Sequence, residues 1–203
     1  MIDVLLQVLI LLYSVILHEV AHGYTALLLG DSTARDAGRL TLNPLKHIDP
    51  FGTVVLPLIL ILTRFPYPVG WAKPVPVNPF LLRDPKRGMM LVGAAGPLAN
   101  VSLVILSALV LRNLPASTPP RLVDLPLFVC YINILLLVFN LVPVPPLDGS
   151  RVLAGILPSR IRQAYLGLEP YGIFIIFALL YLGLIDKVIL PLSRLIFYFL
   201  VQA

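Results

Sequence analysis

The sequence predicts an all-α polytopic membrane protein with about five to six hydrophobic segments, folded as a single domain over residues 1–203. Hydrophobic residues make up 59% of the chain and charged residues only 12%, whereas about 25% charged residues are usual in a soluble domain. The mean hydropathy of +0.96 agrees with a membrane location. Several apolar stretches are also long enough to cross a bilayer. We expect a core over about 1–157, followed by a C-terminal helical hairpin over about 170–202.

Three stretches are predicted to cross the membrane as helices: Val4 to Leu29, Gly88 to Leu111 and Leu125 to Val142. Each approaches or exceeds the roughly 20 residues that about 30 Å of hydrocarbon requires. The second stretch has a face of small residues, which suits close contact between helices. These three spans set the framework of the predicted core.

The chain between the first two spans is predicted to contain shorter elements. Phe51 to Leu62 is apolar but only about a dozen residues long and contains Pro57, which suits a re-entrant or interfacial segment. Arg39 to Leu42 alternates like a short strand. Phe65 to Pro85 is so rich in proline that a regular helix is excluded, and we expect an extended loop or an edge strand there.

The third span runs directly into a proline-rich break, Pro143 to Gly149, where a helix must stop or unwind. Ser150 to Arg162 is predicted to be short and partly helical. Two further apolar segments follow, Tyr171 to Ile185 and Val188 to Val201. Both are short, which predicts a tight helical hairpin.

The cationic residues predict the orientation of the chain. Its net charge of +5 is explained by an excess of Lys and Arg in cytosolic loops, and no interleaving of basic and aromatic residues indicates nucleic acid binding. If the first span runs from outside to inside and the Phe51 segment does not cross, only Arg112, Arg121 and Lys187 face outward. The predicted cytosolic set is then Arg35, Arg39, Lys46, Arg64, Lys73, Arg83, Lys86, Arg87, Arg151, Arg160 and Arg162. We expect a multi-pass protein, and its compactness suggests a prokaryotic cell membrane.

The run His18-Glu19-Val20-Ala21-His22 lies inside the first predicted span. Residues four apart on a helix share one face with β-carbons roughly 6 Å apart, so both imidazoles can bind one zinc while Glu19 lies beside the metal as a base. Ionisable groups at membrane depth indicate function, because burying them in lipid is costly. A catalytic zinc usually has a third protein ligand. The candidates at the same leaflet are Asp148, His47, Asp49 and Asp36, of which Asp148 is best placed because it follows a break at the end of a span.

That run, together with Asn140-Leu141-Val142-Pro143-Val144-Pro145-Pro146-Leu147-Asp148-Gly149, resembles the paired signature of the site-2 protease family, the intramembrane zinc metalloproteases of peptidase family M50. The resemblance covers roughly residues 13 to 155. Supporting similarity lies in Gly38 to Pro44, His47 to Pro50, Gly70 to Asn78 and Ala95 to Asn100. The chain resembles a compact form, because we see neither an insertion for a PDZ domain nor a C-terminal CBS domain.

The resemblance implies a zinc-dependent intramembrane endopeptidase that hydrolyses peptide bonds in or near transmembrane segments by metal-activated water. One Zn²⁺ per chain would be bound by His18, His22 and Asp148. Glu19 would activate the water, and Asn140 would hydrogen-bond the substrate backbone or the developing oxyanion. The implied partners are the lipid bilayer and either single-span membrane proteins or signal peptides. The active site would lie toward the cytosolic leaflet.

Several alternatives remain open at this point. Family members are thought to hold the substrate as an added strand, and Arg39 to Leu42 and Trp71 to Val77 are the candidate edges. The competing function is a non-catalytic membrane zinc-binding protein or a transporter. The side chain of His47 could bond loop backbone, and Asn140 could cap a disrupted helix end. For Asn100, helix packing is the expected role.

Overall fold

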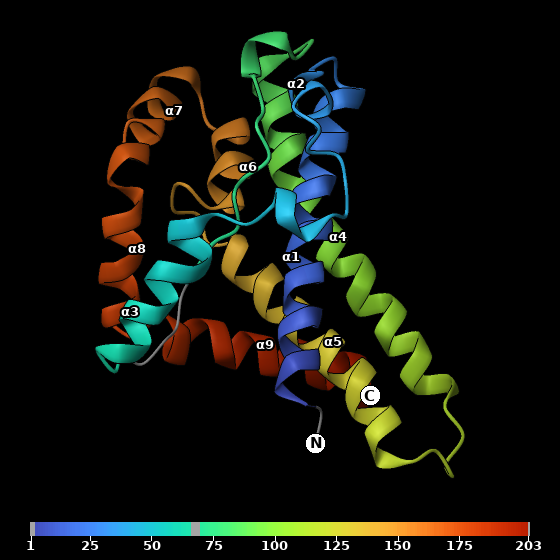
Figure 1. Ribbon diagram of the computed structural model, residues 1–203. Coiled ribbons are helices and arrows are strands. Elements are labelled where there is room, and N and C mark those ends of the chain that lie inside the picture. The colour runs from blue at the N-terminus through green and yellow to red at the C-terminus, as the bar shows by residue number, and fades with distance from the viewer. Residues whose placement is uncertain (1–2, 66–69, 203) are drawn as a thin grey trace.

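The computed structural model describes residues 3–65 and 70–202, and its regular structure is helical (Figure 1). The α-helices of this part are α1 (Val4–Leu28), α2 (Thr33–Asp36), α3 (Leu56–Leu62), α4 (Pro85–Asn113), α5 (Pro120–Asn140), α6 (Asp148–Ile156), α7 (Ser159–Leu166), α8 (Gly172–Tyr181) and α9 (Leu190–Phe197). Short 3₁₀ or π-helical pieces join them: η1 (Pro44–Lys46), η2 (Pro50–Val55), η3 (Pro79–Leu81), η4 (Glu169–Tyr171), η5 (Ile185–Ile189) and η6 (Tyr198–Gln202). The predicted all-α polytopic class is confirmed.

Four helical stretches are long and apolar enough to cross a membrane: α1, α4, α5 and the stretch Ser159–Tyr181, which runs from α7 through α8. The first three agree with the predicted spans. α4 begins before the predicted Gly88, because Pro85 takes its first position and the Asp84 carboxylate accepts hydrogen bonds from the amides of Lys86 and Arg87, both at 3.0 Å.

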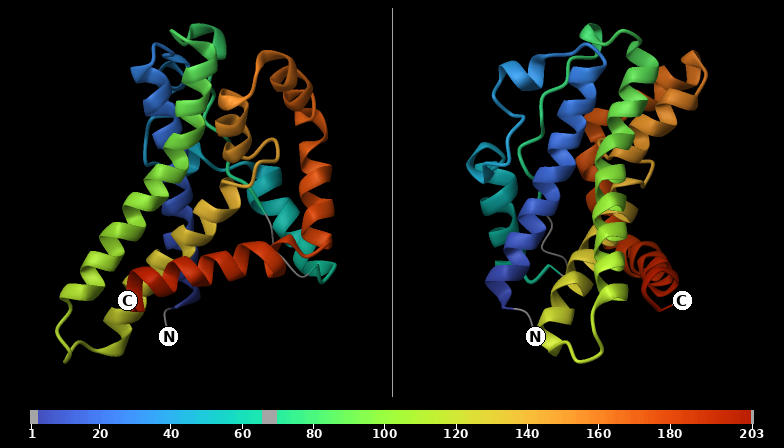
Figure 2. Two further views of the ribbon diagram at one scale, coloured as in Figure 1. Left: turned by 180° about the vertical axis from the view of Figure 1, so that it is seen from behind. Right: turned by 90° about the vertical axis from the view of Figure 1, so that its right-hand side faces the viewer.

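Helix α4 is the centre of the bundle, since it packs against α1, α5 and α6. α1 and α5 rise from the end of the molecule where the chain begins, whereas α4 and α8 run the opposite way (Figures 1 and 2). α5 ends at mid-height, and the chain then turns into α6, which lies beside α4. The start of α6 therefore lies at the level of the middle of α1.

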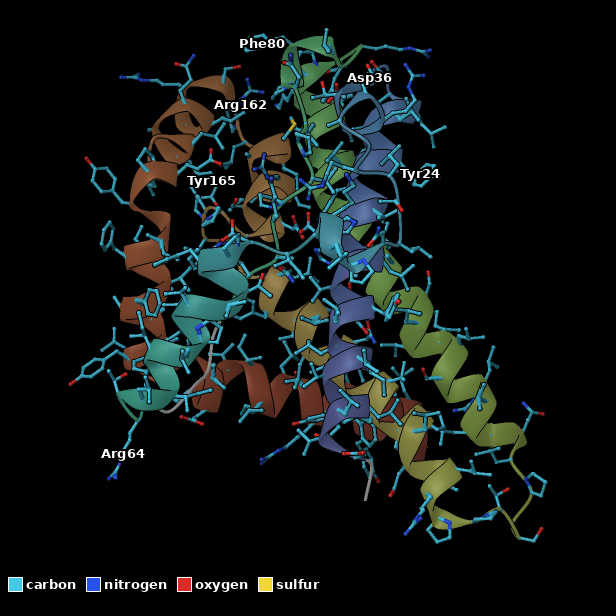
Figure 3. All side chains as sticks on the ribbon, in the orientation of Figure 1. Tyr24, Asp36, Arg64, Phe80, Arg162 and Tyr165 are labelled. Carbon is cyan, nitrogen blue, oxygen red and sulfur yellow. The ribbon has the colours of Figure 1, made fainter. Side chains whose placement is uncertain are left out.

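The short apolar segment is a helix over Pro50–Leu62, formed by η2 and α3 and too short to cross a membrane by itself. It leads to Arg64, whose φ of 55° marks a left-handed turn at the helix end. Arg64 lies at the end of the molecule where α1 begins, opposite to Asp36 and Arg162 (Figure 3). The sequence prediction groups Arg64 with Arg162, but the structure places the two residues at opposite ends of the bundle, because the helix over Pro50–Leu62 descends along it.

The predicted strands do not form in the part of the chain that the structure describes. Arg39 to Leu42 is irregular, and the chain over 70–78 is extended but unpaired as a strand. In the segment over 70–78, Pro74 and Pro76 oppose pairing because they supply no amide for a strand ladder. The expectation of an extended loop is met over 70–78, and residues 66–69 lie outside the described residues.

The C-terminal segments meet at a corner and do not form a tight hairpin (Figures 1 and 2). Gly183 adopts a φ of 89°, a left-handed conformation that glycine takes without steric cost, and the chain then turns through η5. α9 packs against α5, and buried Ile189 at the end of η5 joins a core cluster with Cys130 and Ile134 of α5. α9 therefore packs on the apolar surface of α5, whereas the sequence predicts that it packs against α8.

Candidate metal centre

The helical spacing of α1 places the two predicted histidine ligands against each other. His18 and His22 are buried, and their ring centroids lie 4.7 Å apart in an edge-to-face arrangement. Asp148, the first residue of α6, comes between them: its Oδ2 lies 2.9 Å from Nε2 of His18 and 3.3 Å from Nε2 of His22. The structure therefore brings together the three residues predicted as ligands.

The second nitrogen of each imidazole has its own acceptor. Nδ1 of His18 lies 2.7 Å from Oδ1 of Asn100, and Nδ1 of His22 lies 2.6 Å from the carbonyl oxygen of Val92. Because both partners are acceptors, both Nδ1 atoms donate, and each neutral imidazole keeps its lone pair on Nε2. The tautomer of each ring is thus set by α4, which supplies both acceptors.

The acceptor for His18 belongs to a buried polar chain. Nδ2 of Asn100 donates to Oδ1 of Asn133 at 3.2 Å, and Nδ2 of Asn133 donates to Oγ of Ser14 at 3.0 Å and to the Val129 carbonyl at 2.8 Å. Asn100 and Asn133 are fully buried, and Ser14 is 3% exposed. This chain links α1, α4 and α5, so the framework of the bundle also fixes the orientation of the ligand.

The residues present fit a zinc ion. Asp148 Oδ2 is buried and has no hydrogen-bond partner among the described residues, although two Nε2 atoms lie within 3.3 Å of it. When both imidazoles are neutral and donate from Nδ1, three lone pairs converge on one point, and a bound cation satisfies all three. Two imidazoles and a carboxylate are a donor set that zinc prefers at catalytic sites.

Gly96 makes room for this cluster. A β-carbon at this position would lie 2.4 Å from Nε2 of His22 and 2.5 Å from Nε2 of His18. Such contacts are not sterically possible without moving the rings. The absence of a side chain at Gly96 therefore lets α4 approach the ligand face of α1.

The loop that carries Asp148 is held by α7 and α8. The Tyr165 hydroxyl donates to the carbonyl of Pro143 at 2.8 Å. A β-carbon at Gly172 would lie 2.2 Å from the carbonyl oxygen of Pro145, so α8 begins in direct contact with the loop. The proline-rich break is thus a packed element, as irregular backbone at membrane depth must be.

Glu19 lies beside the ligands and is partly buried. Its Oε2 accepts a hydrogen bond of 2.9 Å from the backbone amide of Val75, in the extended segment over 70–78. Glu19, the three ligands and Asn140 all line one cavity of about 310 Å³. A peptide segment entering this cavity would meet the carboxylate and the ligand set together.

The remaining candidates lie elsewhere or have other partners. Asn140 lines the cavity, while its Nδ2 donates to the Leu136 carbonyl at 3.0 Å, one turn earlier in α5. His47 is 1% exposed and places Nε2 2.8 Å from the carbonyl oxygen of Thr41. Asp49 caps η2, with its Oδ1 accepting from the amide of Gly52 at 2.7 Å. Among the described residues, His47, Asp49 and Asp36 do not join the ligand cluster.

Comparison with known proteins decides the family. The model of "Peptidase family M50" matches residues 117–183. The "Putative zinc metalloprotease YwhC" of Bacillus subtilis is 38% identical over 181 residues, which cover 86% of this chain and 78% of that protein. The chain belongs to peptidase family M50.

Other relatives of this M50 protein agree. Proteins named "Putative zinc metalloprotease Rip2" from Mycolicibacterium smegmatis and Mycobacterium tuberculosis H37Rv are 31% and 29% identical to it. The alignments cover 83% of this chain in both cases, but only 64% and 63% of those proteins. No solved structure matches the chain significantly. The resemblance to the site-2 protease family is confirmed, and the protein is a zinc metalloprotease.

Sequence reasoning missed the groups that orient the histidines of this M50 protein. Asn100 is expected to serve helix packing, yet it bonds His18. Its position offers a signal: it lies four residues after Gly96, on the face of α4 that touches the ligands, and it is polar within an apolar span. The Val92 carbonyl, which bonds His22, and the Val75 amide, which bonds Glu19, are backbone groups, so their roles cannot be predicted from residue type.

Proposed function

We propose that this protein is an intramembrane endopeptidase of the site-2 type, hydrolysing peptide bonds in or near transmembrane segments of membrane-anchored substrates. The observation that carries the proposal is the position of Glu19 beside a converging set of three ligands at mid-length of a spanning helix. His22 and His18 lie about 9 and 15 Å from the end of α1 at 1.5 Å per residue. A peptide bond must therefore reach membrane depth to meet them.

The proposed chemistry assigns a role to each residue at the cavity. His18, His22 and Asp148 would hold one zinc ion per chain, which when bound supplies a Lewis acid that polarises a peptide carbonyl and lowers the pKa of water. Glu19 takes the proton of the attacking water and passes it to the leaving amine. Asn140 donates a hydrogen bond toward the substrate backbone or the oxygen on which negative charge develops.

The expected substrates are single-span membrane proteins or signal peptides left in the bilayer. The compactness of the chain supports a prokaryotic cell membrane. The cation distribution supports an orientation with the cavity toward the cytosolic half, because the ends of α1 and α5 nearest the cavity would then point inward. Both substrate classes offer one apolar helix that can reach membrane depth from the side.

The experiment compares wild type with Glu19→Gln, both reconstituted into liposomes with a panel of single-span substrates. Glutamine has nearly the same shape but does not act as a base, so the rate of cleavage should fall at least about 100-fold. Both proteins should contain one zinc per chain. Equal cleavage by Glu19→Gln would contradict the proposal. A zinc-loaded wild type that cleaves no panel member would favour the non-catalytic alternative.

A further inference from the structure

The extended segment that passes the metal centre is hydrogen-bonded along one side. The Trp71 amide donates to the Gly52 carbonyl at 3.1 Å, and the Trp71 carbonyl accepts from Oγ1 of Thr53 at 2.9 Å. Two residues later, the Lys73 amide donates to the His47 carbonyl at 2.8 Å. Because residues in an extended chain alternate between two sides, residues 71, 73 and 75 face the same way.

Val75 supplies the next amide on this side, and its acceptor is Oε2 of Glu19 at 2.9 Å. Val75 is 8% exposed, so water does not readily replace this bond. Its neighbours Pro74 and Pro76 have no amide hydrogen, and each proline restricts the preceding residue to an extended conformation. The sequence therefore presents a single amide here and holds it in one direction.

Lys73 is fixed at both its backbone groups, two residues before Val75. Besides the bond of its amide to the His47 carbonyl, its own carbonyl accepts from Nη2 of Arg39 at 2.7 Å. Arg39 is only 7% exposed, which is unusual for a guanidinium whose partner is a backbone carbonyl. The loop containing Arg39 and His47 thus sets the position of the segment along its length.

We propose that Val75 is a positioning residue, whose backbone amide holds the Glu19 carboxylate in the orientation needed to act as a base. This inference rests on the proposed function. The amide occupies Oε2, whereas Oε1 has no hydrogen bond from a described residue and is left to take a proton. Arg39 and the His47 carbonyl act one step further away, by fixing Lys73. Loss of the amide leaves the ligands in place but lets the carboxylate turn.

The direct test replaces the Val75 amide by an ester, using the α-hydroxy analogue of valine in cell-free synthesis of the full chain. This change removes the donor and keeps the side chain. An ester at Ala116, in the loop between α4 and α5, controls for the presence of an ester bond. A second pair needs only ordinary mutagenesis: Val75→Pro and Val75→Ala both lose the isopropyl group of valine, but only the proline variant also loses the amide hydrogen.

The readouts are kcat and KM for a single-span substrate in liposomes, and zinc affinity by competition with a chromophoric chelator. A hydrogen bond to a charged group predicts a fall in kcat of about 10- to 100-fold for the Val75 ester relative to the Ala116 ester. We expect kcat of Val75→Pro to be lower than that of Val75→Ala by a similar factor. KM and zinc affinity should stay unchanged, whereas loss of structure would alter them together with kcat.

Equal kcat for the two esters would overturn the positioning role, as would a loss of zinc affinity confined to the Val75 ester. Failure of the proposed function gives a different result: either Glu19→Gln cleaves like wild type, or zinc-loaded wild type cleaves no substrate, and the positioning role falls with it in both cases. If Glu19→Gln is inactive and the two ester variants have equal kcat, the proposed function stands and only the role of Val75 is wrong.

Discussion

His18 and His22 both turn Nε2 toward Asp148, because each ring donates a hydrogen bond from Nδ1 to an oxygen of α4. Such outer hydrogen bonds raise the basicity of a ligand and fix its orientation. His47 is buried still more deeply, but its Nε2 faces a loop carbonyl and it stays outside the ligand cluster. The hydrogen-bond partners, and not the degree of burial, therefore distinguish the two ligand histidines from His47.

The third ligand can be identified by metal analysis of two variants. Asp148→Ala should lose zinc, because two imidazoles alone leave the ion with too few protein ligands. His47→Ala should keep one zinc per chain, since its side chain bonds the Thr41 carbonyl away from the cluster. Elemental analysis of both purified proteins beside wild type measures this. A zinc-free His47→Ala with a zinc-loaded Asp148→Ala would reverse the assignment.

Asn100 should contribute to zinc affinity without touching the ion. Asn100→Leu removes the acceptor of His18 Nδ1 and leaves Asn133 without its donor, so zinc affinity should fall about 10- to 100-fold. Asn100→Asp retains an oxygen acceptor and should recover most of the affinity. Competition with a chromophoric chelator measures both. Wild-type affinity in Asn100→Leu would show that the contact only fills space.

These residues differ in how well sequence alone predicts them. His18, Glu19 and His22 are recognisable because their spacing is local to one helix. Asp148 is recognisable because a proline-rich break precedes it. The partners of Asn100 and of the Val75 amide depend on how α4 and the extended segment pack against α1, and this long-range packing cannot be read from the sequence.

At the scale of elements, Asp31 joins the end of α1 to the extended segment. It is fully buried, and its carboxylate accepts from the Thr33 amide at 2.9 Å, from the Thr33 hydroxyl and from the Asn78 amide at 2.6 Å. Burial raises the pKa of Asp31, but the hydrogen bonds from Thr33 and Asn78 outweigh it and lower the pKa below its usual value near 3.8.

A lowered pKa in the folded state predicts a stabilisation that is present at neutral pH and lost as the pH falls below about 4. Asp31→Asn should therefore unfold at a lower temperature than wild type at pH 7, and the difference should shrink toward pH 3. Thermal unfolding in detergent at several pH values measures both proteins. A difference that is the same at pH 7 and pH 3 would contradict the hydrogen-bonding role of the charged form.

The elements also show where local patterns stop being sufficient. The lengths of α1, α4 and α5 follow from their apolar runs. The predicted hairpin of α8 and α9 is wrong because the choice of partner for α9 depends on the exposed surface of α5, a competition between distant segments. The segment over 70–78 does not pair as a strand, and its prolines remove amides that pairing needs.

At the scale of the whole molecule, the ends of the bundle predict which residues share a side of the membrane. Asp36→Cys and Arg162→Cys should react with an impermeant maleimide only from the cytosolic side, and Arg64→Cys only from the outside (Figure 3). Cys130 is fully buried and should not react, so labelling of intact cells and inverted vesicles reports the introduced thiol. Labelling of all three from one side would contradict this arrangement.

The position of the cut tests the central claim most directly. Wild type in liposomes with a single-span substrate should yield products whose new termini, sequenced by mass spectrometry, fall inside the transmembrane segment or at its cytosolic end. The same products should be absent with Glu19→Gln, which still binds zinc. Cuts confined to water-exposed loops of the substrate, or identical products from Glu19→Gln, would contradict the account.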